Sequence, residues 1–175
     1  AIVGTGFGKH TDDETAKAEV LNGTPFMVWG SGSGLDGIVE GVTKESMSNG
    51  TDFLGYVKYP VKDLLNANYI KAKDYVMYQY GTDYFSAIPE GAKVLVQNAG
   101  KTPISGCIGI FDDAGKADFE KYNNGIVGFE YKQGGKDIVS FANTLDQKGH
   151  CSDEFKYISN FLFSRSLSDT AYKAA

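Results

Sequence analysis

The sequence contains few of the residues on which metal sites, disulfide scaffolds and hydrolytic centres depend. Only two cysteines and two histidines occur among 175 residues. His10 and His150 are far apart in the chain, and no pair of Cys or His ligands has the spacing of a zinc site. No Gly-x-Ser-x-Gly motif accompanies the serines. We therefore expect no metal site and no catalytic residue.

An excess of basic charge and long apolar runs are also missing. The chain has 17 basic and 22 acidic residues and a net charge of -5. It has no excess of basic residues to contact phosphates, so we expect no nucleic-acid partner. No apolar run approaches the roughly 20 residues that span a bilayer, so we expect no membrane insertion. Residues 1–4 lack a charged region before an apolar stretch, so we expect that any leader has been removed. The sequence does not identify the cellular compartment of the protein, and secretion or transport to an organelle is one alternative.

Cys107 and Cys151 are the only thiols, which permits a single disulfide. Closing a loop of about 44 residues would stabilise the fold by about 4 kcal/mol, provided that the two Cα atoms lie within about 7 Å. Two buried free thiols are the alternative, and one accessible thiolate would suffice to attach a chromophore. The sequence does not decide whether these two cysteines are bridged, free or modified.

Length and composition predict one α+β domain over residues 1–175. With 42% hydrophobic and 13% aromatic residues the chain can bury a core, and no linker or repeat divides it. Apolar residues at three- and four-residue steps predict the main helices over 61–79 and 153–166. Capping residues and spacing predict shorter helices over 11–21 and 117–122.

Short apolar segments between glycine and asparagine turns predict three β-hairpins. Their strands are expected over 38–43 and 53–59, over 93–97 and 104–111, and over 126–131 and 138–141. The apolar run 25–29 predicts one further buried strand. The predicted fold is therefore an antiparallel sheet of hairpins packed by the two main helices.

Two glycine clusters are candidates for binding a phosphate or a nucleotide. Residues 1–8, Ala-Ile-Val-Gly-Thr-Gly-Phe-Gly, resemble the strand and glycine turn that open dinucleotide-binding folds, where backbone amides approach a pyrophosphate. Their third glycine falls one residue early, and the next strand ends in Trp29-Gly30 without an acidic residue for a ribose. A second cluster, which contains Gly32 and Gly34, matches the Gly-x-Gly-x-x-Gly spacing. Surface loops or β-bulges are the alternative.

Aromatic residues gather in one third of the chain, and the segment 78–85 is especially rich in them. Large rings with polar tips suit binding surfaces, although ordinary strands also contain them. The predicted ligand-binding residues combine this segment with the glycine turn and its flanking tryptophan: Trp29, Gly32, Gly34, Tyr78, Tyr80, Tyr84 and Phe85.

The scarcity of reactive groupings predicts a non-catalytic binding or structural subunit of a protein assembly, which uses aromatic-rich surface loops. Such a subunit has protein partners or self-assembles. The alternative is a small enzyme, or a carrier of a cofactor or chromophore, with a nucleotide-like ligand at the glycine turns. The sequence does not identify a cofactor. The intact mass with and without reductant would report a disulfide, a glycan or a covalent adduct.

Overall fold

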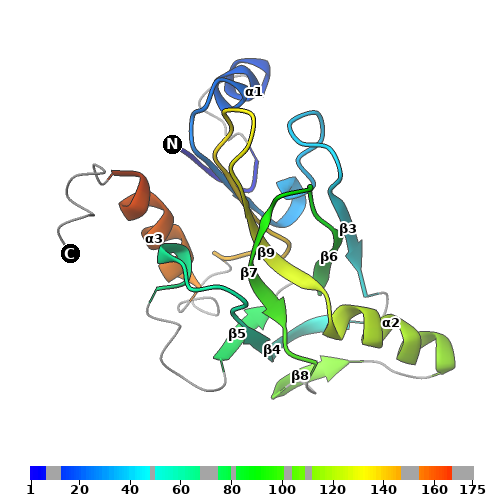
Figure 1. Cartoon of the computed structure of the whole chain (residues 1–175). Coiled ribbons are helices and arrows are strands. Elements are labelled where there is room, and N and C mark those ends of the chain that lie inside the picture. Colours follow the sequence, from blue (N-terminus) through cyan, green and yellow to red (C-terminus); the bar gives the residue numbers. More distant parts are fainter. Residues whose placement is uncertain are drawn as a thin grey trace.

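The computed structural model of the chain describes residues 1–6, 13–47, 50–67, 75–79, 82–100, 104–108, 112–146 and 154–166. Ten strands form one mixed sheet, accompanied by three α-helices and two 3-10 turns. Figure 1 shows α1 at one end of the sheet, beside the turn that joins β9 to β10, and α2 at the other end near β8. In chain order the elements are β1 (Ile2–Gly4), α1 (Asp13–Leu21), β2 (Phe26–Trp29), η1 (Gly30–Gly32), β3 (Thr43–Ser46), β4 (Gly50–Lys58), η2 (Leu64–Asn66), β5 (Tyr75–Gln79), β6 (Asp83–Ala87), β7 (Lys93–Asn98), β8 (Ser105–Ile108), α2 (Asp113–Asn123), β9 (Ile126–Tyr131), β10 (Ile138–Phe141) and α3 (Phe155–Ser166).

Three parallel strands form one edge of the sheet. β2 lies between β1 and β10 in parallel registers that set Ile2 and Ile138 on either side of Phe26. Every residue of β2 is buried, so its sequence is a continuous apolar run, as is typical of buried parallel strands. β1, α1 and β2 form a β-α-β unit.

The prediction of an antiparallel hairpin sheet packed by two helices is therefore wrong. The main sheet order is β1-β2-β10-β9-β7-β4-β5, with parallel pairs at its β1 edge. One predicted hairpin is confirmed, because β9 and β10 pair antiparallel. The other two do not form: β3 pairs with β6, β8 pairs with β4, and β7 pairs with β4 and β9. Turn residues show where a chain reverses, but they do not determine which strands become neighbours.

The predicted helix over 61–79 is wrong at both described ends of that range. Asp63 caps the short turn η2, where its carboxylate accepts a hydrogen bond from the Leu65 N–H at 2.9 Å. Residues 75–79 form β5, which pairs antiparallel with β4. Tyrosine and valine favour strands, and this preference outweighed the helical spacing of the apolar residues.

The other helices lie where capping and spacing predicted them. α1 ends at Leu21, and Gly23, with φ of +98°, follows its last turn. α2 is longer than predicted because Asp112 caps it, accepting a hydrogen bond from the Gly115 N–H at 2.7 Å. α3 occupies most of the predicted 153–166 range. Residues 11, 12 and 153 of the predicted helices lie outside the described residues.

The sheet separates two apolar cores, because successive residues of β2 point to opposite faces. Phe26 and Val28 belong to one core, together with Ile138 of β10. Met27 and Trp29 belong to the other core, which also takes in Val139, Phe141, and Tyr157 of α3. The buried strand β2 therefore contributes side chains to the cores on both faces of the sheet, at its parallel edge.

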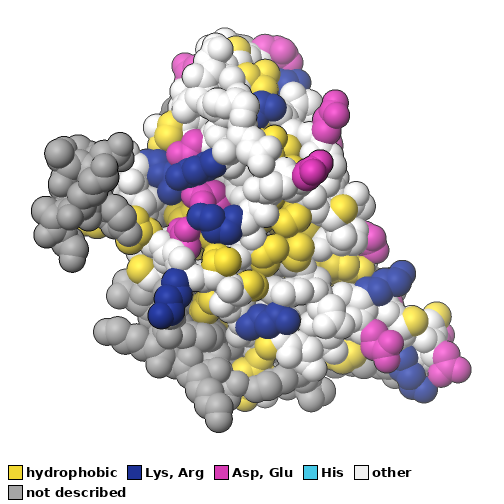
Figure 2. Space-filling model, in the orientation of Figure 1, with side chains coloured by type: hydrophobic (Ala, Val, Ile, Leu, Met, Phe, Trp, Pro, Cys, Tyr) yellow, Lys and Arg dark blue, Asp and Glu magenta, His cyan; other side chains and the backbone are white. Residues whose placement is uncertain are grey.

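A buried carboxylate on β9 ties α3 to the sheet. Glu130 is only 3% exposed and accepts hydrogen bonds from Lys93 Nζ at 2.5 Å and from Arg165 Nη2 at 2.7 Å. Lys93 also bonds to Asp63, and Arg165 also bonds to Asp137. Burial raises the pKa of Glu130, but the two hydrogen bonds outweigh burial and hold this pKa below its ordinary value. Figure 2 shows these acidic and basic side chains gathered between α3 and the central strands.

Replacing Glu130 with glutamine should lower the free energy of unfolding by about 2 kcal/mol, because Lys93 and the buried Arg165 each lose one of their two carboxylate partners. Since the folded-state pKa of Glu130 is lowered, its stabilising effect is present above the unfolded value of about 4.3 and is lost as the pH falls through the folded value. Urea unfolding, followed by the fluorescence of the single tryptophan, measures the change.

The matched control is Glu120→Gln, which alters an exposed glutamate on α2 and should leave stability unchanged. Wild type should lose more stability than Glu130→Gln on acidification. Equal stabilities of wild type and Glu130→Gln at neutral pH would contradict the role given to this carboxylate.

Candidate functional site

β2 ends in a sharp turn at the carboxyl end of the parallel strands. Gly30 follows the strand directly, has φ of +65° and begins η1. Its carbonyl oxygen accepts hydrogen bonds from Ser33 Oγ at 2.7 Å and from Lys44 Nζ at 2.8 Å. A positive φ favours glycine, which explains why this turn has a glycine at its first position. We call residues 30–34 the elbow.

Gly32 holds the elbow against the turn that follows β1. A Cβ added to Gly32 would lie 2.4 Å from the carbonyl oxygen of Thr5, which is a backbone atom. A side chain at position 32 would therefore push the two turns apart. Gly34 differs, since the nearest atom to an added Cβ is Asp36 Oδ1 at 4.0 Å. Close packing thus requires glycine at one of these two positions only.

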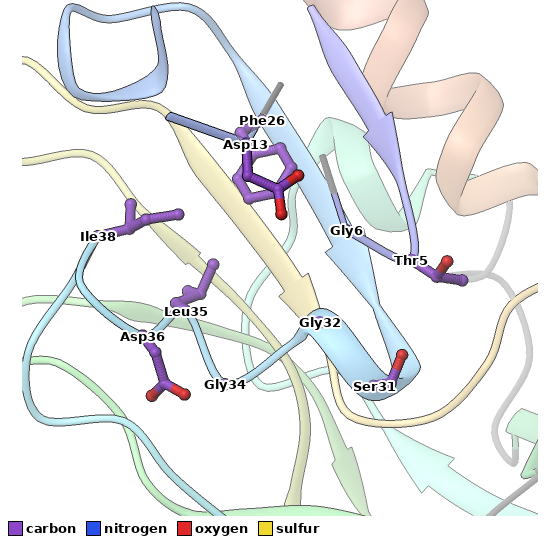
Figure 3. Close-up of a pocket in the computed structure, with 10 residues that line it drawn as sticks. All are labelled: Thr5, Gly6, Asp13, Phe26, Ser31, Gly32, Gly34, Leu35, Asp36 and Ile38. Carbon is purple, nitrogen blue, oxygen red and sulfur yellow. The ribbon is translucent and has the colours of Figure 1, made fainter. Parts of the chain in front are cut away.

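A cavity of about 470 Å³ opens where the elbow meets the end of β1 and the start of α1. In Figure 3, Leu35 and Ile38 lie on one side of Asp13 and Phe26, and the Asp36 side chain points away from them. We call it the elbow cavity. Its lining residues are Thr5, Gly6, Asp13, Phe26, Ser31, Gly32, Gly34, Leu35, Asp36 and Ile38. In open α/β sheets, ligands bind outside the carboxyl ends of the strands, and this cavity has that position.

The elbow cavity presents carboxylates and neutral polar groups to a ligand. Asp13, the first residue of α1, is exposed, as are Ser31 on the elbow and Asp36 beyond it. No lysine or arginine is among the described residues that line the cavity. The two charged residues of this described lining are both acidic, which favours a ligand with a positive charge or hydrogen-bond donors over a phosphate, whereas Lys17 Nζ lies close to Gly37, beside the cavity.

Gly30 occupies the kind of position that carries the nucleophile in some hydrolase folds. In a nucleophile elbow, a serine sits on a strained turn between a strand and a helix. Here a Cβ on Gly30 would lie 3.1 Å from Thr144 Oγ1, so the position faces the segment after β10, but glycine supplies no nucleophile. Trp29 Nε1 donates to Asp146 Oδ1 at 2.9 Å and fixes the same segment. The elbow offers a ligand its backbone groups and the Ser31 hydroxyl.

Gly32 and Gly34, both predicted to bind a ligand, line the elbow cavity. Trp29, from the same predicted set, is 4% exposed and packs in the core beside the elbow. The segment after the elbow forms turns, with Leu35 and Gly37 at positive φ, and not the helix that a dinucleotide-binding fingerprint requires. The elbow therefore departs from the dinucleotide pattern although it lies at the expected edge of the sheet.

Tyr84 and Phe85 do not form an exposed loop surface. They belong to β6, where they are 2% and 1% exposed, and they line a second cavity. Tyr80 and the side chain of Tyr78 lie outside the described residues. The aromatic segment is therefore split between strands, and its described rings pack inward.

The cysteine predictions fall largely outside the described residues. The backbone of Cys107 is part of β8, but its side chain and the whole of Cys151 are not described, so the disulfide stays a prediction. Among the described residues, no three His, Cys, Asp or Glu side chains gather as a metal site would need. In the same part of the chain, no helix has the length and apolar character to cross a membrane.

Sequence reasoning missed Asp13 and Ser31 as lining residues. Asp13 belongs to the predicted helix over 11–21 and Ser31 lies between two glycines, and neither residue was predicted to bind a ligand. The signal that would have identified them is the β-α-β unit, because it brings the start of α1 and the end of β2 to the same edge. That unit becomes visible only when the parallel pairing of β1 with β2 is known.

The parallel edge and the mixed sheet define a Rossmann-like fold. A protein described as a GMP synthase component from Thermoplasma acidophilum superposes with a TM-score of 0.54 at 10% identity, over 86% of this chain and 64% of that chain. PurLQS from Thermotoga maritima superposes with a TM-score of 0.50 at 13% identity, over 88% and 67% of the two chains. A glutamine amidotransferase from Thermotoga maritima gives a TM-score of 0.48 at 13% identity, over 88% and 55%.

These likenesses show the fold alone, because the sequence identities are low. This chain spans 64% of the length of the Thermoplasma acidophilum protein, which is less than two thirds. Comparison with protein-family models and with curated protein sequences gives no match.

The prediction of a non-catalytic structural subunit with aromatic surface loops is corrected by these comparisons. The Thermoplasma acidophilum structure that shares the fold is named as a component of a synthase, not as a structural protein. The aromatic residues on which that prediction depended are buried where they are described. The strand ends at the parallel edge are therefore the first place to look for a binding site.

Gly32→Ala should destabilise the protein by about 2 kcal/mol, because the new Cβ meets a backbone carbonyl and forces the elbow away from the turn after β1. Gly34→Ala is the matched control and should change stability by less than about 0.5 kcal/mol. Urea unfolding of both variants measures the difference, and equal effects would contradict the close packing described for Gly32.

Proposed function

We propose that this chain binds a small polar molecule that carries an ammonium group, and that the molecule occupies the elbow cavity. The observation that supports the proposal is the combination of place and charge. The cavity lies at the carboxyl ends of β1 and β2, and Asp13 lines it without a basic residue among the described lining.

The lining suits such a ligand on both its polar and its apolar sides. The Asp13 carboxylate attracts the ammonium group, and the Ser31 hydroxyl can donate or accept a further hydrogen bond. Phe26, Leu35 and Ile38 offer an apolar wall for the carbon chain. A volume of about 470 Å³ is within the range of small-molecule sites.

A nucleotide at the glycine turns is the second candidate. The start of α1 at the cavity favours it, because helix N-termini attract anions. Asp13 and Asp36 oppose it by repelling phosphate at the same place. The enzyme names of the structures with this fold support a substrate as the ligand in either case.

Protein partners or self-assembly also stay a proposal. The support for it is the outer face of α3, where Phe155, Leu162 and Phe163 are 40%, 47% and 62% exposed. A native mass that is a multiple of 18.9 kDa would show self-assembly.

The ligand proposal is tested by titrating the protein with 1,4-diaminobutane, glutarate and inorganic phosphate, with amide chemical shifts as the readout. The diamine should shift the amides of Gly6, Gly32 and Gly34 in a saturable manner. Asp13→Asn should weaken its binding about fivefold, as expected for a partly exposed ion pair worth about 1 kcal/mol.

Glu14→Gln is the matched control, because Glu14 is the next residue of α1 and does not line the cavity. It should leave the affinity unchanged. Tighter binding of phosphate than of the diamine at the same amides would replace the proposal with the nucleotide candidate. No saturable shift with any of the three probes would refute both.

A further inference from the structure

A second cavity, of about 430 Å³, lies between β3, β6 and the end of α2. Phe85 and Ile126 give it an apolar floor, and Glu45 and Lys121 bring opposite charges to it. We call it the Tyr84 cavity, after the tyrosine whose hydroxyl bonds to Glu45. Figure 2 shows hydrophobic side chains at the surface above α2, with acidic and basic side chains at their edge.

The acidic side of the Tyr84 cavity is held in place by the protein. Tyr84 donates its hydroxyl hydrogen to Glu45 Oε2 at 2.9 Å. The tyrosine ring is itself fixed, because it packs against Gly125, where an added Cβ would lie 2.6 Å from Tyr84 Cβ, and makes an edge contact with Tyr122 at 5.9 Å. Hydrogen bonds from Ser86 and Tyr84 hold the pKa of Glu45 below its ordinary value. Glu45 is therefore an oriented carboxylate, charged at neutral pH.

The basic side comes from the last turn of α2. Lys121 lies close enough for its charge to act on Glu45, yet it belongs to a different element. Gln97 lies at the same rim, with its amide oriented by a hydrogen bond from Nε2 to Asn124 O at 2.8 Å. Asp118, one turn earlier on α2, adds a second negative charge near Glu45. The cavity therefore offers separate positions for a cation and an anion above an apolar floor.

We propose that the Tyr84 cavity binds a small zwitterion, namely a free α-amino acid with an apolar side chain. Its ammonium group bonds to Glu45, its carboxylate to Lys121, and its side chain packs on Phe85 and Ile126. This ligand chemistry differs from that of the elbow cavity, whose described lining has carboxylates but no basic residue. The two sites are therefore separable by the ligands that they accept.

The test is a titration with L-leucine, followed by amide chemical shifts, beside two analogues that each lack one charge. These analogues are 3-methylbutylamine, without the carboxylate, and 4-methylpentanoate, without the ammonium group. Leucine should shift the amides of residues 84–86 and 124–126 in a saturable manner. Each analogue should bind at least about tenfold more weakly, since each loses one hydrogen bond between charged groups.

Glu45→Gln and Lys121→Gln should each weaken leucine binding about tenfold, and Glu45→Gln keeps an acceptor for the Tyr84 hydroxyl. Lys116→Gln is the matched control, because Lys116 lies on the same helix, pairs with Asp113 and does not line the cavity. No saturable shift with leucine would overturn the proposal, as would shifts confined to the elbow cavity or unchanged affinity in both charge variants. Because the probes and the reporting amides differ, failure here leaves the elbow-cavity proposal to its own test.

Discussion

The burial of β2 between β1 and β10 is the constraint on which the rest of the structure depends. A strand with neighbours on both edges and apolar side chains on both faces must be covered twice, and the two cores supply that cover. The parallel direction of the three strands also brings their carboxyl ends together. The elbow and its cavity lie where β2 leaves the sheet. The burial of β2 therefore determines both the packing of the two cores and the position of the cavity.

Charged side chains are arranged differently in three regions of the protein. Around Glu130, carboxylates and cations neutralise one another and fasten α3 to the sheet. In the elbow cavity, the described lining carries negative charge alone. The Tyr84 cavity carries both signs on separate elements. The charges around Glu130 are therefore paired within the protein, whereas the two cavities present charges that a ligand can pair.

Local features were predictable from the sequence, and distant pairing was not. The end of α1 follows from Gly23, and the β9–β10 hairpin follows from a short glycine-containing turn. The Asp112 cap was missed, so α2 begins earlier than predicted. The parallel edge was missed because β10 lies more than a hundred residues after β2, and no local signal links Ile138 to Phe26. The site was missed for the same reason, because no local signal shows which strands pair. The elbow glycines were predicted to bind a ligand, but Asp13 is brought close to them only by the β-α-β unit.

The central claim is that the parallel edge ends in a binding site for an ammonium group. A crystal structure of the protein grown with 1,4-diaminobutane tests it most directly. The account predicts density for the diamine between the elbow and the start of α1, with one nitrogen within hydrogen-bond distance of the Asp13 carboxylate. Density for the diamine elsewhere on the chain, with the elbow cavity filled by water alone, would contradict it.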